Sequence, residues 1–247
     1  MTEITVFDIP SRDPCRSWSL NTWKTRLALH YKGIDYNAEW VEFPDIEELA
    51  KSYGLAPNDT SDPHAHAYTI PIIRFKDSKS GKSEYVMDSR AIAEELERRY
   101  PSPSLLLEDP LLPEVEAFMP KVWTPLIPVL MGNLPRNVLT ETSASYYHKT
   151  RSARDGAPLD EIERRGGGDV AWNGCREPLN ELDAKLKKNG GPFLLGQTPS
   201  YADFFIYIYI DFPLYIFGKM NITVKNTAKA KISQGAIATQ FWGRKRN

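Results

Sequence analysis

Strand-like and helix-like patterns alternate along the first hundred residues, and their order limits the possible folds more than any other feature. Strands are predicted at residues 4–9, 36–43, 69–75 and 85–87, and helices at residues 20–32, 45–53 and 88–100. Pro71 lies inside the β-branched run of the third strand, where proline is tolerated only at the start of a strand. The order βαβ, helix, ββα predicts a compact α+β domain over residues 1–101 rather than a doubly wound sheet.

The rest of the chain shows no convincing strand pattern. A proline-rich stretch predicts an interdomain linker at residues 102–112, and an all-helical domain is predicted at residues 113–247. Its most apolar segment runs from Asp203 to Asp211 and is shorter than the roughly 20 residues that a helix needs to cross a bilayer. This segment is therefore predicted to be a buried core helix.

Several residues predict where the helices begin, end and face the core. Capping boxes are predicted at Asp45–Glu48 and Ser200–Asp203, and Gly33 and Gly54 are expected to end the helices that precede them. The predicted buried stripes are Leu20, Trp23, Leu27 and Tyr31 in the first helix, and Cys175, Leu179, Leu182 and Leu186 in the helical domain. The first helix of that domain is expected to be kinked or broken at Pro120, Pro125 and Pro128.

Composition and charge exclude several classes of function. The net charge of -1 gives no positive field for a phosphate backbone, so we expect no nucleic-acid partner. The N-terminus does not resemble a signal peptide, and Cys15 and Cys175 fit no disulfide or metal pattern, so we expect a reducing, cytoplasmic setting and no membrane association. His64 and His66 have no third ligand nearby, so no metal site is predicted.

Three motifs carry a resemblance to a known family. They are TIPII at residues 69–73, DSRAI at residues 88–92 and GPFLLGQTPSYADF at residues 191–204. In this order and spacing they resemble the motifs of a glutathione transferase, and residues 1–212 are similar in detail to the fungal FuA, etherase-like class. The resemblance implies a thioredoxin-like glutathione-binding domain followed by an all-α domain, with a cis proline at Pro71. The sequence after Phe212 departs from the family pattern.

The resemblance implies catalysis by a hydroxyl group near the start of the first helix. Ser19 matches the family's catalytic serine, and a hydroxyl at a helix N-terminus would stabilise the thiolate of glutathione as a donor rather than as a nucleophile. The backbone and amide of Asn21 would assist. Three alternatives stay open: Ser17 is the donor, Ser19 is only an N-cap, or Cys15 forms a mixed disulfide with glutathione. The positions that carry Cys-x-x-Cys in thioredoxin-like redox proteins hold no cysteine here, which argues against dithiol exchange.

The other glutathione-binding residues also follow from the resemblance. The backbone of Ile70, next to Pro71, would pair with the cysteinyl part of glutathione. Asp88 and Ser89 would bind the γ-glutamyl end, since a helix N-terminus suits a carboxylate and an acid suits an ammonium group. Arg90 is a weaker candidate for the same carboxylate.

The predicted activity is that of a serine-type glutathione transferase. It would conjugate glutathione, its co-substrate, to hydrophobic aromatic electrophiles, or remove it from them, as in detoxification. Trp18 is predicted to lie in a loop where it would stack on an aromatic ligand. A homodimer is expected from the resemblance alone. The unusual sequence after Phe212 favours one alternative, a non-catalytic carrier of plant or wood polyphenols on the same fold.

Overall fold

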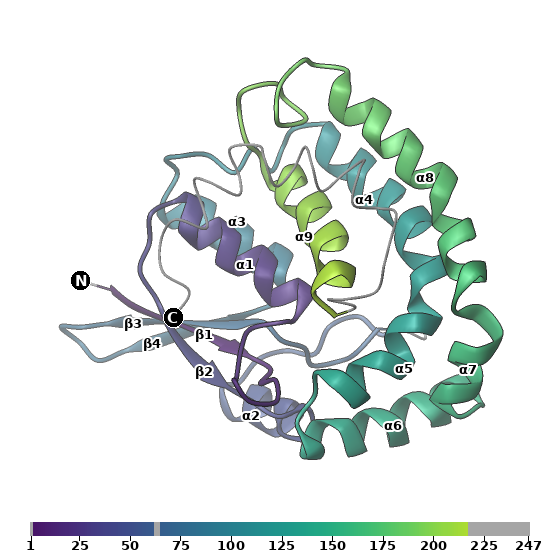
Figure 1. The fold of residues 1–247 in the computed structure, drawn as a ribbon. Helices are drawn as coiled ribbons and strands as arrows, with labels where there is room; N and C mark the ends of the chain where they lie inside the picture. Colours follow the sequence, from purple (N-terminus) through teal and green to yellow (C-terminus); the bar gives the residue numbers. More distant parts are fainter. Residues whose placement is uncertain (1, 62–64, 217–247) are drawn as a thin grey trace. The chain divides into compact units, whose positions relative to one another are not determined.

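The computed structural model describes residues 2–61 and 65–216, which belong to two compact units (Figure 1). The first unit runs to Pro103 and also includes the segment Val138–Tyr147. The second unit begins at Ser104 and holds the remaining helical residues. The sequence after residue 216, which contains most of the atypical tail, lies outside the described residues.

The first unit is built on a four-stranded mixed sheet. Its strands are β1 (Thr2–Asp8), β2 (Asn37–Trp40), β3 (Ile72–Asp77) and β4 (Ser83–Met87), in the order β2-β1-β3-β4. β1 is parallel to β2 and antiparallel to β3, and β3 is antiparallel to β4. The predicted order of βαβ, helix and ββα is confirmed, and it gives the thioredoxin-like arrangement.

Three α-helices accompany this sheet, namely α1 (Leu20–Tyr31), α2 (Ile46–Ser52) and α3 (Ser89–Arg99). α1 and α3 pack side by side on one face of the sheet, and α2 lies on the other side (Figure 1). Fully buried branched side chains of β3 and α3 form much of the core of this unit, among them Ile72, Ile73, Ile92 and Leu96. Gly33 and Gly54 follow α1 and α2 with φ values of 67° and 69°, so they end these helices as predicted.

The predicted buried face of α1 is wrong. Of the expected stripe only Leu27 is buried, whereas Trp23 is half-buried. The buried positions include Thr22, Thr25 and Arg26, which are polar. The helix is covered on more than one side, and threonines pack there much as valines would, so an apolar stripe does not mark its inner face.

The predicted capping box at Asp45–Glu48 is also wrong. A short 3₁₀ helix, η1 (Phe43–Asp45), runs directly into α2, so Asp45 has helical backbone angles and its side chain caps nothing. The box at Ser200–Asp203 is confirmed in a modified form. The Asp203 carboxylate accepts hydrogen bonds from Ser200 N at 2.9 Å, from Ser200 Oγ at 2.6 Å and from Leu194 N at 2.7 Å. Burial nevertheless raises the pKa of Asp203.

The segment Val138–Tyr147 joins the first unit through side-chain contacts that its sequence does not reveal. Arg12 donates from Nε to the Leu139 carbonyl at 2.6 Å. The Glu42 carboxylate accepts hydrogen bonds from the hydroxyl groups of Thr140, at 2.6 Å, and of the fully buried Ser143. The unit thus takes in a piece of chain that follows the predicted linker by several helices.

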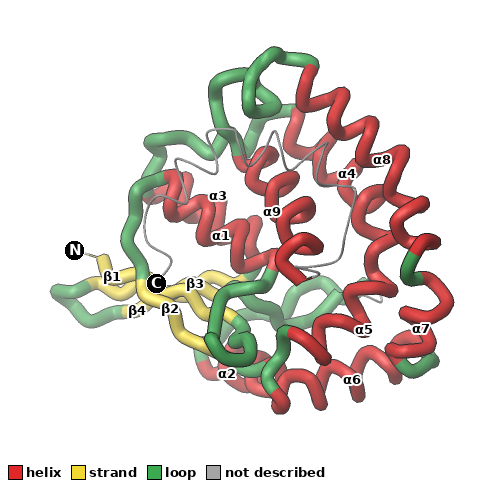
Figure 2. Tube along the Cα trace, viewed as in Figure 1, coloured by secondary structure: helices red, strands yellow, loops and turns green. Residues whose placement is uncertain are grey.

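The second unit contains helices only, within the described residues (Figure 2). They are α4 (Leu111–Trp123), η2 (Thr124–Leu126), α5 (Ile127–Asn137), the C-terminal part of α6 (Glu141–Asp155), α7 (Leu159–Gly166), α8 (Asp169–Lys187) and α9 (Tyr201–Ile216). The predicted break is confirmed, because α4 ends at Trp123 and η2, which contains Pro125, separates it from α5. α4 begins inside the range expected for the linker.

α9 is the buried core helix that its composition predicts. Phe204, Ile206 and Ile208 are at most 4% exposed. None of the helices described is both long and apolar enough to cross a membrane.

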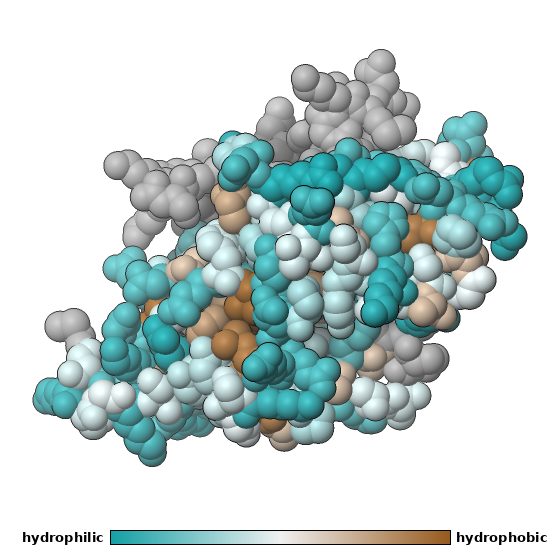
Figure 3. Space-filling view, turned by 90° about the horizontal axis from the view of Figure 1, so that it is seen from below, coloured by the Kyte–Doolittle hydropathy of each residue, from teal (hydrophilic) through white to brown (hydrophobic). Residues whose placement is uncertain are grey.

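Hydrophilic residues cover most of the molecular face drawn in Figure 3, and hydrophobic ones form small separate areas. Apolar side chains are thus gathered mainly in the cores.

An ion-pair cluster on α3 makes stability depend on pH. Hydrogen bonds from Arg98 and Arg99 lower the pKa of Glu95 from 4.5 to about 2. A lowered pKa stabilises the fold above the unfolded value, and this contribution is lost as the pH falls through the folded value. Because Arg98 is mostly solvent-exposed, we expect wild type to lose about 1–2 kcal/mol more than Glu95→Gln between about pH 5 and pH 2. Urea unfolding at both pH values tests this, and equal losses would contradict it.

Candidate functional site

The sheet topology brings three separate segments to one end of the first unit. β1 and β3 are antiparallel, with Phe7 opposite Ile72, and Ile72 also faces Met87 at the end of β4. The loop that follows β1, the residues that precede β3 and the start of α3 therefore meet at this end. A hydrogen bond from Asp88 N to the Pro71 carbonyl, 3.1 Å long, joins the last two.

Ser19 lies at the N-cap position of α1. Its backbone is extended, with φ of -62° and ψ of 125°, and its carbonyl accepts the first helical hydrogen bond from Trp23 N at 3.0 Å. The Ser19 side chain makes no capping hydrogen bond, although the residue is only 7% exposed. The hydroxyl thus lies beside the unsatisfied N–H groups of a helix start without being used to satisfy them, and this arrangement favours an anion.

Ser17 and Asn21 flank this position. The Ser17 hydroxyl is buried and has no hydrogen-bond partner within the described residues, and its carbonyl accepts from Trp23 Nε1 at 3.2 Å. Ser17 precedes the helix by three residues, so the helix N-terminus acts more directly on Ser19. Asn21 is exposed, and its amide oxygen accepts from Lys24 Nζ at 3.0 Å.

Trp18 lies in the loop before α1, as predicted, but its side chain is turned into the interior. Its side chain is 6% exposed, its indole N–H donates to the Pro10 carbonyl at 3.2 Å, and its ring packs near Phe43 with centroids 6.2 Å apart. Trp18 is therefore an interior residue, which speaks against the expected stacking on a ligand. Cys15, in the same loop, is an exposed free thiol.

The peptide bond between Ile70 and Pro71 is cis, which confirms the expectation drawn from the TIPII motif. Ile70 is 4% exposed. Its backbone N–H and carbonyl have no hydrogen-bond partner in the described part of the chain. Buried backbone groups are rarely left unpaired, so these groups suit an extended peptide ligand.

Asp88, rather than Ser89, is the N-cap of α3. Its carboxylate accepts from Arg90 N at 2.8 Å, and its φ of 82° is unusual for a residue other than glycine. Such a conformation costs about 1–3 kcal/mol and is often found at functional sites. Ser89 is the first helical residue and is 5% exposed. Arg90 pairs along the helix with Glu94 at 2.8 Å.

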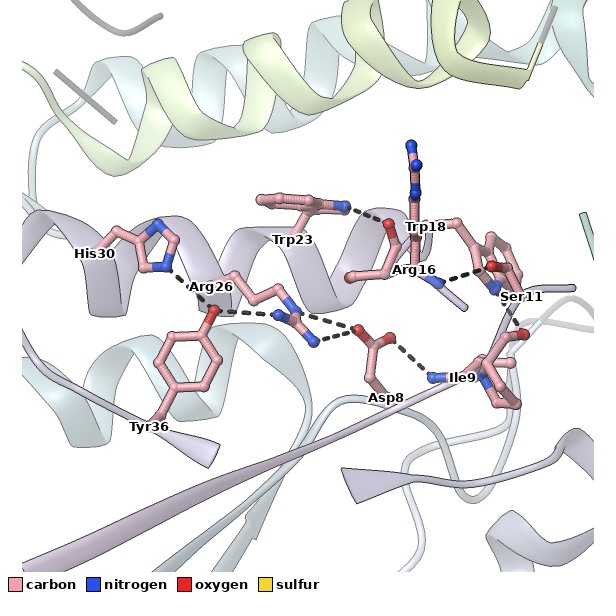
Figure 4. A network of polar contacts seen from close by, with 11 residues as sticks. Asp8, Ile9, Ser11, Arg16, Trp18, Trp23, Arg26, His30 and Tyr36 are labelled. Carbon is pink, nitrogen blue, oxygen red and sulfur yellow. Dashed lines mark hydrogen bonds and ion pairs between the residues drawn. The ribbon is translucent and has the colours of Figure 1, made fainter. Parts of the chain in front are cut away.

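A polar network with a buried ion pair links the end of β1 to α1, and the sequence did not indicate it (Figure 4). The Asp8 carboxylate is fully buried and forms an ion pair with Arg26, with Nη2 at 3.0 Å and Nε at 3.2 Å from Oδ2. Its other oxygen accepts from Ile9 N at 2.8 Å. Arg26 also donates to the Tyr36 hydroxyl at 3.2 Å, and this hydroxyl lies 3.2 Å from His30 Nε2. The only sign of this network in the sequence is Asp8, an acidic residue at the end of the apolar strand β1.

Aromatic rings surround the Arg26 guanidinium. Its central carbon lies 5.9 Å from the ring centre of Trp23, 5.5 Å from that of Tyr36 and 5.9 Å from that of Trp40. Burial raises the pKa of Tyr36, and the neighbouring Arg26 only partly opposes this rise. The cation is therefore fixed both by a carboxylate and by ring faces.

The second unit, taken by itself, holds an aromatic cluster between α4 and α9. Trp123 meets the edge of Tyr209 with centroids 5.0 Å apart, and Phe205 stacks on Tyr209 at the same separation. Burial, followed by the charge of Glu116, raises the pKa of Tyr209. In residues 2–61 and 65–216 no group of three or more His, Cys, Asp or Glu side chains could hold a metal ion. His64 lies outside these ranges.

Comparisons with known proteins agree with this architecture. A model of the glutathione S-transferase N-terminal domain matches residues 18–99, and a model of the C-terminal domain matches residues 115–218. The glutathione S-transferase-like protein ustS of Aspergillus flavus is 32% identical over an alignment of 223 residues, and the match covers 83% of this chain and 78% of that protein.

Solved structures of fungal proteins are similar along almost the whole chain. Glutathione transferase GSTFuA2 from Phanerochaete chrysosporium is 30% identical, with a TM-score of 0.79 over 99% of this chain and 98% of that one. The glutathione S-transferase CsGST63524 of Ceriporiopsis subvermispora, crystallised in complex with glutathione, is 26% identical with a TM-score of 0.78 over 99% of both chains. From its fold, its domain matches and these relatives, the chain belongs to the glutathione transferase family.

Proposed function

We propose that the first unit binds glutathione and that Ser19 stabilises its thiolate for reaction with an aromatic electrophile. The observation that carries the proposal is the Ser19 hydroxyl, which stands at the N-terminus of α1 and does not cap the helix. The bound thiol loses its proton to solvent, and the Ser19 O–H and the N-terminal N–H groups of α1 stabilise the sulfur anion. The sulfur then attacks carbon, a C–S bond forms, and the leaving group departs with the electron pair of the broken bond.

The other residues proposed to bind glutathione lie at the same end of the sheet as Ser19. The backbone N–H and carbonyl of Ile70, beside Pro71, would pair with the cysteinyl residue. Asp88 would bind the γ-glutamyl ammonium, and the start of α3 at Ser89 would bind the carboxylate. Arg90 is less suited, because Glu94 already pairs with its guanidinium. Support comes from the CsGST63524 structure, whose glutathione is bound to the same fold.

The proposed electrophile is hydrophobic and aromatic, and the reverse removal of glutathione from such adducts belongs to the same chemistry. This class rests on the family resemblance. Trp18 is too deeply buried to contribute. A cytoplasmic homodimer is part of the same proposal and rests on the family resemblance.

Ser19→Ala tests the assignment of the catalytic hydroxyl. Loss of a hydrogen bond to a charged group costs about 1–3 kcal/mol, so kcat/KM for conjugation or thiolysis should fall roughly 5- to 150-fold. Steady-state kinetics with an aromatic electrophile and glutathione measure this loss. Ser17→Ala is the matched control and should keep kcat/KM within about twofold, since Ser17 lies three residues before α1 and the helix N-terminus acts more directly on Ser19.

Other outcomes separate the alternatives. Full turnover in Ser19→Ala with a loss in Ser17→Ala would transfer the role to Ser17. Full turnover in both variants would show that neither Ser17 nor Ser19 takes part in the reaction. Tight binding of polyphenols by the wild type, without turnover of any electrophile, would favour a non-catalytic carrier.

A further inference from the structure

The loop between β1 and α1 delivers Ser19 to its position, and hydrogen bonds hold both ends of this loop. At its start, the Asp8 carboxylate accepts from Ile9 N at 2.8 Å. At its end, the indole of Trp23 donates from Nε1 to the carbonyl of Ser17 at 3.2 Å. The second bond fixes the peptide group two residues before Ser19, and the donor comes from the first turn of α1 itself.

Arg26 contacts both side chains that hold the ends of this loop, Asp8 and Trp23. Its guanidinium pairs with the Asp8 carboxylate at 3.0 Å, and its central carbon lies 5.9 Å from the centre of the Trp23 ring (Figure 4). Trp23 and Arg26 are three residues apart on α1 and are therefore neighbours on the helix surface. Asp8, Arg26, Trp23 and the Ser17 carbonyl form a continuous chain of contacts that begins at the end of β1 and ends beside Ser19.

We propose that Trp23 is a positioning residue for the reaction, and that its indole N–H holds the Ser17 carbonyl so that the Ser19 hydroxyl meets the sulfur of glutathione. This inference rests on the function proposed for Ser19. Trp23 touches neither the sulfur nor the electrophile in this role. A displacement of the hydroxyl weakens its hydrogen bond to the thiolate, because such bonds lose strength steeply with distance and angle.

The test is a double-mutant cycle of Trp23→Phe and Ser19→Ala. Phenylalanine keeps one aromatic ring beside Arg26. It lacks the indole N–H donor and the second ring of tryptophan. In the wild-type background we expect Trp23→Phe to lower kcat/KM roughly 3- to 10-fold, mainly through kcat, with KM for glutathione within about twofold. In the Ser19→Ala background the same change should have almost no further effect, because the hydroxyl that it positions is absent.

Trp40→Phe is the matched control. Trp40 lies at the same 5.9 Å from the Arg26 guanidinium, and its indole makes no hydrogen bond within the described part of the chain. This variant should keep kcat/KM within about twofold. If Trp23→Phe does not fold, as judged by its thermal transition, Trp23 is replaced with benzothienylalanine, an isostere that lacks only the N–H group, and the same losses are expected.

The failure of the inference and that of the proposed function give different results. Equal losses from Trp23→Phe in both backgrounds, or no loss in the wild-type background, would overturn the positioning role while Ser19→Ala still shows its own defect. Full turnover in Ser19→Ala would overturn the proposed function itself, and with it the role of Trp23.

Discussion

Arg26→Met is expected to lower the free energy of unfolding by about 3–5 kcal/mol, because it leaves the Asp8 carboxylate buried without its counter-charge. The Asp8 side chain is 0% exposed, and Ile9 N would remain as a hydrogen-bond donor to one of its oxygens. A loss of this size is a large part of the stability of an ordinary domain. Urea unfolding at neutral pH, followed by tryptophan fluorescence, measures it.

Two further variants show whether the unpaired charge is the cause. Arg165→Met removes an exposed i,i+4 partner of Glu161 and should cost less than about 0.5 kcal/mol. The double variant Asp8→Leu/Arg26→Met removes both charges and should regain most of the lost stability, since apolar replacement of a buried ion pair is often neutral. A double variant as unstable as Arg26→Met would show that the loss comes from packing and not from the charge.

Lys32→Met is expected to lower the free energy of unfolding by about 2–4 kcal/mol. The Lys32 side chain is fully buried, and its ammonium group donates to Glu97 Oε2 at 2.6 Å, to the Tyr100 carbonyl at 2.6 Å and to the Pro103 carbonyl at 2.9 Å. Methionine fills a similar volume but leaves these acceptors unpaired at the end of α3. Urea unfolding again measures the change.

Lys51→Met is the control for this prediction. Lys51 also pairs with a glutamate, Glu47, at 2.6 Å, but both side chains are more than half exposed. Its replacement should leave the midpoint of urea unfolding almost unchanged, because an exposed ion pair contributes little to stability. A similar cost for both lysine variants would mean that burial of the Lys32 ammonium contributes nothing to stability.

The order of the strands and helices along the first unit could be predicted because its signals are local, whereas the cis proline was expected from the family resemblance of the TIPII motif. Alternation, β-branched runs and helix-ending glycines specify the elements of the first unit, and the TIPII motif marks the start of β3. The motif that contains Asp88 likewise marks the start of α3 correctly. These features depend on a few neighbouring residues, so no knowledge of distant contacts is needed.

Buried polar residues could not be predicted in the same way. Asp8 pairs with a residue 18 positions away, and Lys32 pairs with one 65 positions away, so the sequence near either gives no sign of a partner. The helical stripe of apolar residues placed Trp23 in the core, and Trp18 was expected to stack on a ligand from its loop, whereas the structure has Trp23 half-buried and Trp18 buried. Tertiary hydrogen bonds and ion pairs decided these positions.

The Glu42 contacts illustrate the same limit for domain organisation. They join Val138–Tyr147 to the first unit across about a hundred residues of sequence, and the helical pattern of that segment does not differ from that of its neighbours. This whole region was assigned to the helical half because it shows no strand pattern, and the lack of a strand pattern carries no information about such long-range pairing.

The pKa of the thiol of bound glutathione tests the role of Ser19 most directly. Thiolate absorption, titrated with pH in the complex with glutathione alone, measures it without any electrophile. We expect the thiol pKa in wild type to lie below the value near 8.5 of an ordinary thiol, and to be about 1–2 higher in Ser19→Ala. The same thiol pKa in both proteins, with glutathione bound to each, would contradict it.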